Sequence, residues 1–487
     1  MSILEKAREL AVIRTSASVL GWDQETYLPP SAAAFRAKQL AWLSSQAHQI
    51  ATSDDWKRAL ESAEAADSGN DPRHSANLRE LRRDFDRSAK LPVELVARHS
   101  TAKSLAMHAW ADARKRSDFA SFAPHLETLL GIAREKAELW GYADEPYDAL
   151  LEGYERATST AAVATLLDDL KRSMTDISAK AVEKSRTRGA KLPAGPYPVA
   201  SQQKLNALVA EAVGFDFNAG RIDTTAHPFC TTLGPRDCRL TTRYDEDDFT
   251  SSLFGVLHEA GHGLYEQGLP VDDFGLPSGS SVSLGIHESQ SRLWENHVGR
   301  SRSFWNRWYP AAQEIFPQLA SFPLDDFLAF LWRAEFSPIR VESDEATYDL
   351  HIILRFGLER RMLNGELAVA DVPAAWNEEF RELFGFTPEN DTQGCLQDIH
   401  WSMGGLGYFS TYTLGNINSA QLFAAARKDP SIASAIDATE YAPLLAWLRK
   451  NVHSNGATLD PANLMENATG GKPSTADYLA HLSSRYL

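Results

Sequence analysis

The sequence has 487 residues, of which 43% are hydrophobic and 23% are charged, a composition typical of globular proteins. Its formal net charge is −16, which opposes binding to nucleic acid and to anionic lipid surfaces. No apolar run approaches the roughly 18 residues of a membrane span. These features predict a protein with neither a nucleic-acid partner nor a membrane partner.

Helical periodicity dominates residues 1–185, which contain few internal glycines or prolines. Residues 1–20 predict an amphipathic helix, because charged side chains break the apolar run that a secretory signal needs. Residues 187–198 are rich in Gly, Pro and Lys and predict a loop or hinge. Residues 237–244 are the best strand candidate, and helices dominate again toward the C-terminus. We expect a mainly α-helical protein and a single domain over residues 1–487.

The three cysteines, Cys230, Cys238 and Cys395, are too few for a disulfide framework, and their number is odd. Apolar neighbours such as Phe229 and Leu396 predict that they are buried free thiols. Together with the absence of a secretory signal, this pattern predicts a protein of the reducing cytoplasm.

A helix predicted over residues 251–268 carries His258, Glu259 and His262. Three residues are candidates for its N-terminal cap: Thr250, Ser251 and Ser252. The two histidines are four residues apart, so both imidazoles project from one face of the helix. That spacing lets two ring nitrogens meet one metal ion at about 2.0–2.1 Å, as in zinc peptidases. Glu259 is then placed to act on a water beside the metal without binding the metal. The alternative is a helix with two hydrogen-bonded histidines and no metal.

A catalytic zinc site needs a third protein ligand. A third histidine six residues beyond His262, as in metzincins, is excluded because that position is Gly268. An acidic residue beyond the Gly/Ser-rich loop of residues 268–285 remains, and its spacing favours Glu288. Two other acidic residues compete with it: Glu266 and Glu295. His287 is interpreted as a partner of a ligand and not as a ligand itself.

Several motifs in series are similar to those of the Taq-type thermostable zinc carboxypeptidase family, and they cover most of the chain. They are residues 21–30 (GWDQETYLPP), 227–229 (HPF), 237–241 (DCRLT), 258–262 (HEAGH), 287–290 (HESQ), 339–344 (IRVESD) and 394–401 (GCLQDIHW). One departure is Ser343, where the family usually has alanine. Because the exchange is small for small and Arg340 and Asp344 remain, it puts little in doubt.

The resemblance implies a large helical zincin-type fold with a deep active-site groove and a small β-sheet near the zinc. It also implies a cytoplasmic homodimer and Glu288 as the third ligand. The expected activity is zinc-dependent release of single C-terminal residues from peptides, with Co²⁺ or Mn²⁺ able to replace Zn²⁺. Two alternatives stay open: an endopeptidase or dipeptide-releasing peptidase with the same zinc core, and an inactive peptide-binding scaffold.

A carboxypeptidase must bind a terminal carboxylate, and the planar fork of an arginine suits that task. Arg340 is the favoured candidate, supported by the family resemblance. Its alternative role is an ion pair with one of three neighbouring acids: Glu342, Asp344 or Glu345. Arg239 and Arg355 are lesser candidates, and Arg239 is expected to brace the strand through Asp237.

The oxyanion that forms during peptide hydrolysis needs a hydrogen-bond donor. His400 and Tyr408 are the candidates, in a segment whose clustered glycines suggest close backbone approach to a substrate. Tyr412 is a further substrate-binding candidate, although packing in the core is the ordinary role of both tyrosines. His227 is expected to line the groove, with a structural role in a turn as an equally weighted alternative.

Overall fold

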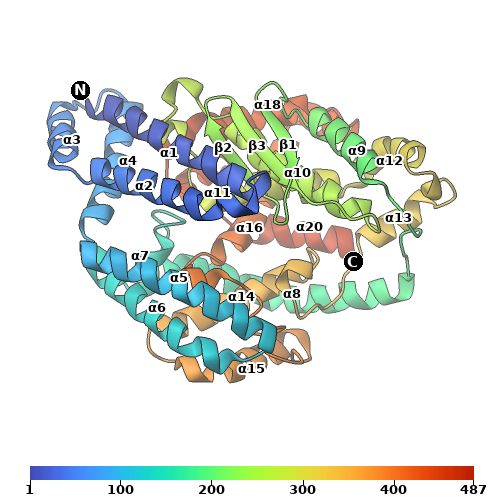
Figure 1. Ribbon diagram of the computed structural model, residues 1–487. Coiled ribbons are helices and arrows are strands. Elements are labelled where there is room, and N and C mark those ends of the chain that lie inside the picture. Colours follow the sequence, from blue (N-terminus) through green and yellow to red (C-terminus); the bar gives the residue numbers. More distant parts are fainter. The chain divides into compact units, whose positions relative to one another are not determined.

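The computed structural model describes residues 1–487, and most of them lie in helices (Figure 1). The prediction of a mainly α-helical protein is therefore confirmed. No helix combines the length and the apolar character that crossing a membrane would require.

The chain forms two compact units, each assembled from three segments. Unit 1 comprises Met1–Ser88, Ala190–Leu331 and Asn418–Pro473, and unit 2 comprises Ala89–Gly189, Trp332–Ile417 and Ser474–Leu487. The boundary after Gly189 falls in the predicted loop of residues 187–198, which is non-helical from Gly189 to Pro198. The hinge and the single domain over residues 1–487 stay predictions.

Unit 1 contains the helices α1 (Ile3–Thr26), α2 (Ala33–Ala51), α3 (Asp54–Ala66), α4 (Pro72–Ala89, whose last residue belongs to unit 2), α9 (Val199–Ala212), α10 (Phe249–Glu266), α11 (Leu284–Arg292), α12 (Arg302–Ile315), α13 (Leu324–Leu331), α17 (Pro430–Asp437), α18 (Ala442–Asn451) and α19 (Pro461–Thr469). Its short helical turns are η1 (Pro30–Ala32), η2 (Val271–Asp273), η3 (Pro277–Gly279), η4 (Leu293–Gly299, π-helical), η5 (Pro317–Leu319) and η9 (His453–Thr458).

Unit 2 contains α5 (Val93–Arg116), α6 (Phe119–Trp140), α7 (Pro146–Leu151), α8 (Thr160–Arg188), α14 (Tyr348–Leu363), α15 (Val372–Phe384) and α20 (Ala476–Tyr486), with the turns η6 (Arg340–Glu342), η7 (Val369–Asp371) and η8 (His400–Met403). Helix α16 (Ser410–Arg427) begins in unit 2 and ends in unit 1. The helical prediction for residues 1–185 is confirmed by α1 to α8.

A three-stranded sheet in unit 1 consists of β1 (Gly220–Thr224), β2 (Cys230–Gly234) and β3 (Asp237–Thr242) in the order β1-β3-β2. Strand β3 runs parallel to β1 and antiparallel to β2. The strand predicted over residues 237–244 is confirmed as β3, whereas β1 and β2 were not predicted. The sheet packs against α10 (Figure 1). Gly263 of α10 allows the Leu240 side chain of β3 to approach the helix closely.

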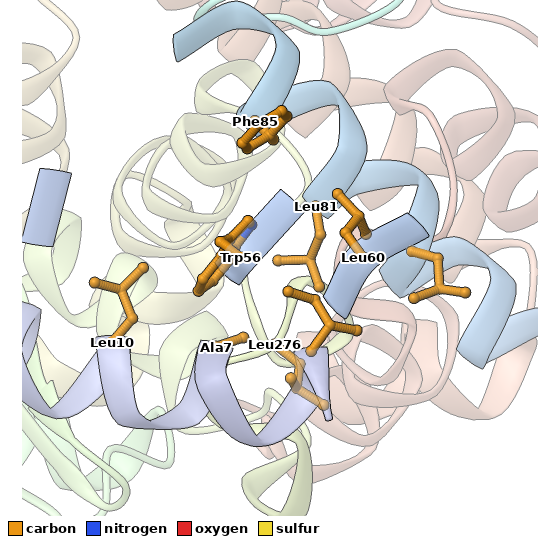
Figure 2. Packing of buried hydrophobic residues seen from close by; sticks show 9 residues of the cluster. Ala7, Leu10, Trp56, Leu60, Leu81, Phe85 and Leu276 are labelled. Atoms are coloured by element: carbon orange, nitrogen blue, oxygen red, sulfur yellow. The ribbon is translucent and has the colours of Figure 1, made fainter. Parts of the chain in front are cut away.

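Helices α1, α3 and α4 pack through a buried apolar cluster at helical spacing (Figure 2). Its members are Ile3, Ala7, Leu10, Trp56, Leu60, Leu78, Leu81, Phe85 and Leu276. Leu276 belongs to the loop that joins α10 to α11, so the cluster anchors that loop. Arg73 adds an ion pair to Asp273 in the same loop, with 2.5 Å between Nε and Oδ2. The N-terminal helices thus fix the connection between two helices that carry candidate metal ligands.

Helix α10 confirms the helix predicted over residues 251–268, shifted by two residues toward the N-terminus. Its N-terminal cap is Asp248, whose Oδ1 accepts the Thr250 N–H at 2.9 Å. The prediction of Thr250, Ser251 or Ser252 as the cap was therefore wrong. Asp248 combines the cap with a negative charge at the positive end of the helix dipole.

Candidate active site

At Gly261, the backbone of α10 lies directly against the backbone of α11. A Cβ atom at this position would lie 2.5 Å from both the Gln290 carbonyl oxygen and the Ser291 Cα. Only glycine fits without moving one of the two backbones. This close approach brings Glu288 of α11 next to His258 and His262 of α10.

His258, His262 and Glu288 form a group that could hold a metal ion. Glu288 Oε2 lies 3.7 Å from His258 Nε2 and 3.5 Å from His262 Nε2, and the ligand atoms of all three residues lie within 4.8 Å of one another. Two imidazole nitrogens and one carboxylate oxygen are a donor set that suits zinc and related transition metals. The residues present therefore fit a catalytic metal ion.

The second nitrogen of each of these histidines is already engaged. His258 Nδ1 lies 2.9 Å from Glu295 Oε2, and His262 Nδ1 lies 2.5 Å from His287 Nδ1. His287 Nε2 lies 2.9 Å from Glu266 Oε1. Because a carboxylate only accepts, we assign the protons to His258 Nδ1, His287 Nε2 and His262 Nδ1. This assignment leaves a lone pair on Nε2 of His258 and of His262, on the side of Glu288.

The structure thus separates the three acidic residues that the spacing left in competition. Glu288 is the one that forms the cluster with both Nε2 atoms. Glu295 instead binds Nδ1 of His258, and Glu266 binds His287, which contacts His262. Glu295 lies in the π-helical turn η4, which directly continues α11. The seven-residue spacing of Glu288 and Glu295 places both carboxylates on one helix face, but it does not show which of them meets the Nε2 atoms.

Burial and charge act in opposite directions on the acidic residues of this site. Burial favours the protonated form of Glu288. Arg292, whose Nε donates to Oε1 at 2.7 Å, outweighs burial together with His258 and His262 and holds the pKa of Glu288 well below its usual value. Glu259 has no such guanidinium contact, and burial raises its pKa to about 7. Glu288 therefore stays an anion, as a metal ligand must, while Glu259 is suited to exchange protons near neutral pH.

Replacing Glu295 by glutamine is expected to lower the affinity for a divalent metal by about 10- to 100-fold, because His258 Nδ1–H loses its charged acceptor. Competition with a chelator measures that affinity directly. Glu314→Gln, which changes an exposed glutamate of α12, is the control and should leave it unchanged. Equal metal affinities in the two variants would contradict the role of Glu295.

A second cluster lies in unit 2, around Arg340. Its Nε and Nη2 donate to Asp398 Oδ1 at 3.1 and 2.7 Å, and its Nη1 donates to the Tyr348 hydroxyl at 2.7 Å. Arg355 also pairs with Asp398, with 2.7 Å between Nε and Oδ2. The acids considered as ion-pair partners from the sequence, Glu342, Asp344 and Glu345, were the wrong ones.

Two features make the Arg340 cluster suited to binding an anion. Arg340 and Arg355 share the single carboxylate of Asp398, so the trio carries one more positive than negative charge. Three of the five N–H groups of Arg340 donate to Asp398 and Tyr348, which leaves two for another acceptor. Arg355 is 1% exposed and Arg340 is 6% exposed, so Arg340 is the more accessible of the two.

His400, Tyr408 and Tyr412 lie together in unit 2. The Tyr412 hydroxyl is 3.4 Å from His400 Nε2, and the rings of His400 and Tyr408 are 5.3 Å apart. His400 Nδ1 is buried without a hydrogen-bond partner in the protein, and burial lowers the pKa of this histidine to about 4. A neutral imidazole with an unsatisfied buried nitrogen is suited to meet a polar ligand atom.

Glu359 of α14 holds both ends of the segment that carries His400 and Tyr408. Its carboxylate accepts the Trp401 indole N–H at 2.8 Å, the Gly407 N–H at 3.1 Å and the Tyr147 hydroxyl at 3.1 Å. These groups are buried, so the hydrogen bonds fix the Trp401 side chain next to His400 and the Gly407 backbone next to Tyr408.

The free energy of unfolding should depend on pH through Glu359. Burial raises its pKa to about 7 in the folded state, whereas a solvated glutamate titrates near pH 4.5. The folded state therefore binds the proton more tightly, and this contribution to stability is lost as the pH rises from 4.5 to 7. Relative to Glu359→Gln, the wild type should lose on the order of 3 kcal/mol over this range, measured by urea unfolding. Glu366→Gln, at an exposed glutamate, should parallel the wild type, and a constant difference between wild type and Glu359→Gln would contradict the assignment.

The remaining residues singled out from the sequence lie in unit 1. His227 is exposed in the segment that leads into β2. Arg239 braces β3 as expected, because its Nε and Nη2 donate to the two carboxylate oxygens of Asp237 at 2.9 and 3.1 Å. The guanidinium of Arg239 also lies over the Trp22 ring, 4.3 Å from its centroid.

Two histidines and a glutamate clustered at the contact of two helices in a mainly helical fold are typical of a metallopeptidase. The chain belongs to the carboxypeptidase Taq (M32) metallopeptidase family, whose model matches residues 2–486. The predicted family is therefore confirmed, and so is the predicted enzyme class, a metallocarboxypeptidase that hydrolyses peptide bonds.

Relatives of known structure and known name resemble the chain over its whole length. Thermostable carboxypeptidase 1 of Thermus thermophilus is 40% identical over 501 residues, covering 100% of this chain and 98% of that protein. Among solved structures, metallocarboxypeptidase 1 of Trypanosoma cruzi has a TM-score of 0.96 at 32% identity, covering 99% of this chain and 98% of the other. The M32 carboxypeptidase of Deinococcus radiodurans has a TM-score of 0.95 at 36% identity with the same coverage.

Proposed function

We propose that this protein is a zinc carboxypeptidase of broad specificity that releases single residues from the C-terminus of peptides. His258, His262 and Glu288 hold the metal, for which Co²⁺ or Mn²⁺ can substitute. The observation that carries the proposal is the convergence of two imidazole Nε2 atoms on one buried carboxylate, while the Nδ1 atom of each histidine is hydrogen-bonded to another side chain. A bound divalent ion would polarise the scissile carbonyl and acidify water.

The remaining chemistry belongs to side chains of the protein. Glu259 takes a proton from the attacking water on its carboxylate and delivers it to the amine of the leaving residue. His400 or Tyr408 donates a hydrogen bond to the oxyanion, through an imidazole N–H or the phenolic hydroxyl. The unsatisfied Nδ1 of His400 favours this residue as a donor.

Recognition of the substrate terminus falls to Arg340, whose two remaining N–H groups match the two oxygens of a carboxylate. The excess positive charge of the trio with Arg355 and Asp398 supports this role. His227 and Tyr412 are proposed to line the substrate-binding surface. We also propose, on the family resemblance, that the enzyme acts in the cytoplasm as a homodimer.

Product analysis tests the proposal. The zinc-loaded protein should release single residues in succession from a peptide with a blocked N-terminus, and nothing from the same peptide with a C-terminal amide. Removal of the metal with a chelator should stop release, and added zinc should restore it. Release of dipeptides or internal fragments would replace this function by that of a dipeptide-releasing peptidase or an endopeptidase. Tight peptide binding without any product would indicate a scaffold.

A further inference from the structure

Two free thiols lie next to each other on one face of the sheet that packs against α10. Cys230 of β2 lies opposite Leu240 of β3, two residues beyond Cys238, so both cysteine side chains point to the same face of the sheet. Their sulfur atoms are 3.5 Å apart. A disulfide bond measures about 2.0 Å, so the sulfurs have to close by about 1.5 Å.

The two thiols differ in their access to solvent. Cys238 is buried, at 2% exposure, whereas Cys230 is partly exposed. Cys230 is therefore the more accessible of the two residues, and Cys238 is the second thiol of the pair. Cys395, the third cysteine, is buried in unit 2 and serves as a control.

Strand β2 is connected to the candidate metal centre by hydrogen bonds. Thr232, directly opposite Cys238, donates from Oγ1 to Glu266 Oε2 at 2.8 Å. Glu266 in turn accepts from His287, which contacts His262 at Nδ1. A shift of β2 toward β3 at Cys230 therefore acts on the residues that orient His262.

We propose that Cys230 and Cys238 are a reversible dithiol–disulfide pair, oxidised by hydroperoxides, and that closing the disulfide weakens the adjacent metal centre. The Cys230 thiolate attacks the peroxide oxygen, so the O–O bond breaks, the alcohol leaves and a sulfenic acid forms. Cys238 then attacks the Cys230 sulfur, so the S–S bond forms and the hydroxyl leaves as water with the Cys238 proton. Overall the two thiols lose two electrons and two protons, and the hydroperoxide becomes one alcohol and one water.

The surroundings make this oxidation slow at neutral pH. Contact with Cys238 and burial raise the pKa of the Cys230 thiol well above its usual value, and Glu259 and Glu266 of α10 act in the same direction. Because the thiolate is the reactive form, the pair responds to sustained and not to brief exposure. The oxidation is therefore best tested at pH 8.5.

The test uses the full-length, zinc-loaded protein treated with tert-butyl hydroperoxide, then alkylated and digested with trypsin. We expect the peptide of residues 222–236 to appear disulfide-linked to the peptide of residues 237–239 in the wild type and in Cys395→Ser. The link should be absent in Cys230→Ser and in Cys238→Ser. Oxidised wild type should release its metal to a chelator several-fold faster and lose several-fold in turnover, and dithiothreitol should restore both.

Two results would overturn the proposal. One is oxidation of Cys230 to the sulfinic acid without any cross-link to Cys238. The other is a complete cross-link that leaves metal release unchanged. The disulfide and the rate of metal release are measured without turnover, and only the weakening of the metal centre rests on the proposed function. A protein that binds metal but cleaves no peptide would therefore refute that function and still test the thiol pair.

Discussion

Replacing Glu259 by glutamine is expected to lower kcat by about 10²- to 10⁴-fold while the metal stays bound. Glutamine has nearly the same shape but cannot take up a proton from water, so the variant loses the proton carrier and keeps the three metal-binding side chains. The Michaelis constant should change little, because Glu259 acts after the peptide has bound. Peptide turnover and metal content, measured on the same preparation, check both parts of the prediction.

A matched control for this variant lies on the neighbouring helix α9. Glu211→Gln changes an exposed carboxylate of the same unit and should keep full turnover. If Glu259→Gln retained its metal and also retained wild-type turnover, Glu259 would not be the proton carrier.

Replacing Arg340 by methionine is expected to lower kcat/KM for peptides with a free C-terminus by about 10²- to 10³-fold. Losing one partner of a desolvated charge pair costs about 3–4 kcal/mol, and this corresponds to that factor. Methionine fills much of the same volume, and Asp398 keeps its ion pair with Arg355. The enzyme should also lose its preference for a free-acid peptide over the matching amide, which a competition assay between the two substrates measures.

Arg360→Met is the matched control, because Arg360 is likewise an ion-paired arginine of unit 2. It binds both carboxylate oxygens of Glu145, at 2.7 and 3.0 Å. This variant should lose some thermal stability and keep the preference for the free acid. An unchanged preference in Arg340→Met would assign carboxylate recognition to another residue.

Features set by local sequence were predicted well. The four-residue spacing of His258 and His262 is sufficient to place both rings on one face of the predicted helix, which the structure contains as α10. The cap was misassigned because Asp248, Thr250, Ser251 and Ser252 are all good capping residues, and the choice depends on where the chain leaves β3.

Features that depend on distant contacts could not be predicted. Glu288 and Glu295 are seven residues apart and share a helix face, so only the packing of α11 against α10 decides which carboxylate meets both Nε2 atoms. Asp398 lies 58 residues from Arg340 and cannot be chosen over nearer acids by spacing. Strand β1 was missed because its parallel pairing with β3 links segments separated by β2.

The close contact at Gly261 also bears on how this enzyme can evolve. In an ordinary exposed helix, alanine would be more stable than glycine by about 1 kcal/mol, so stability alone would favour replacing the glycine. Here the added methyl group would wedge the two backbones apart and carry Glu288 away from the histidines. The gain in helix stability would then be smaller than the cost of losing the metal site. Selection for activity therefore keeps a glycine that selection for helix stability alone would remove.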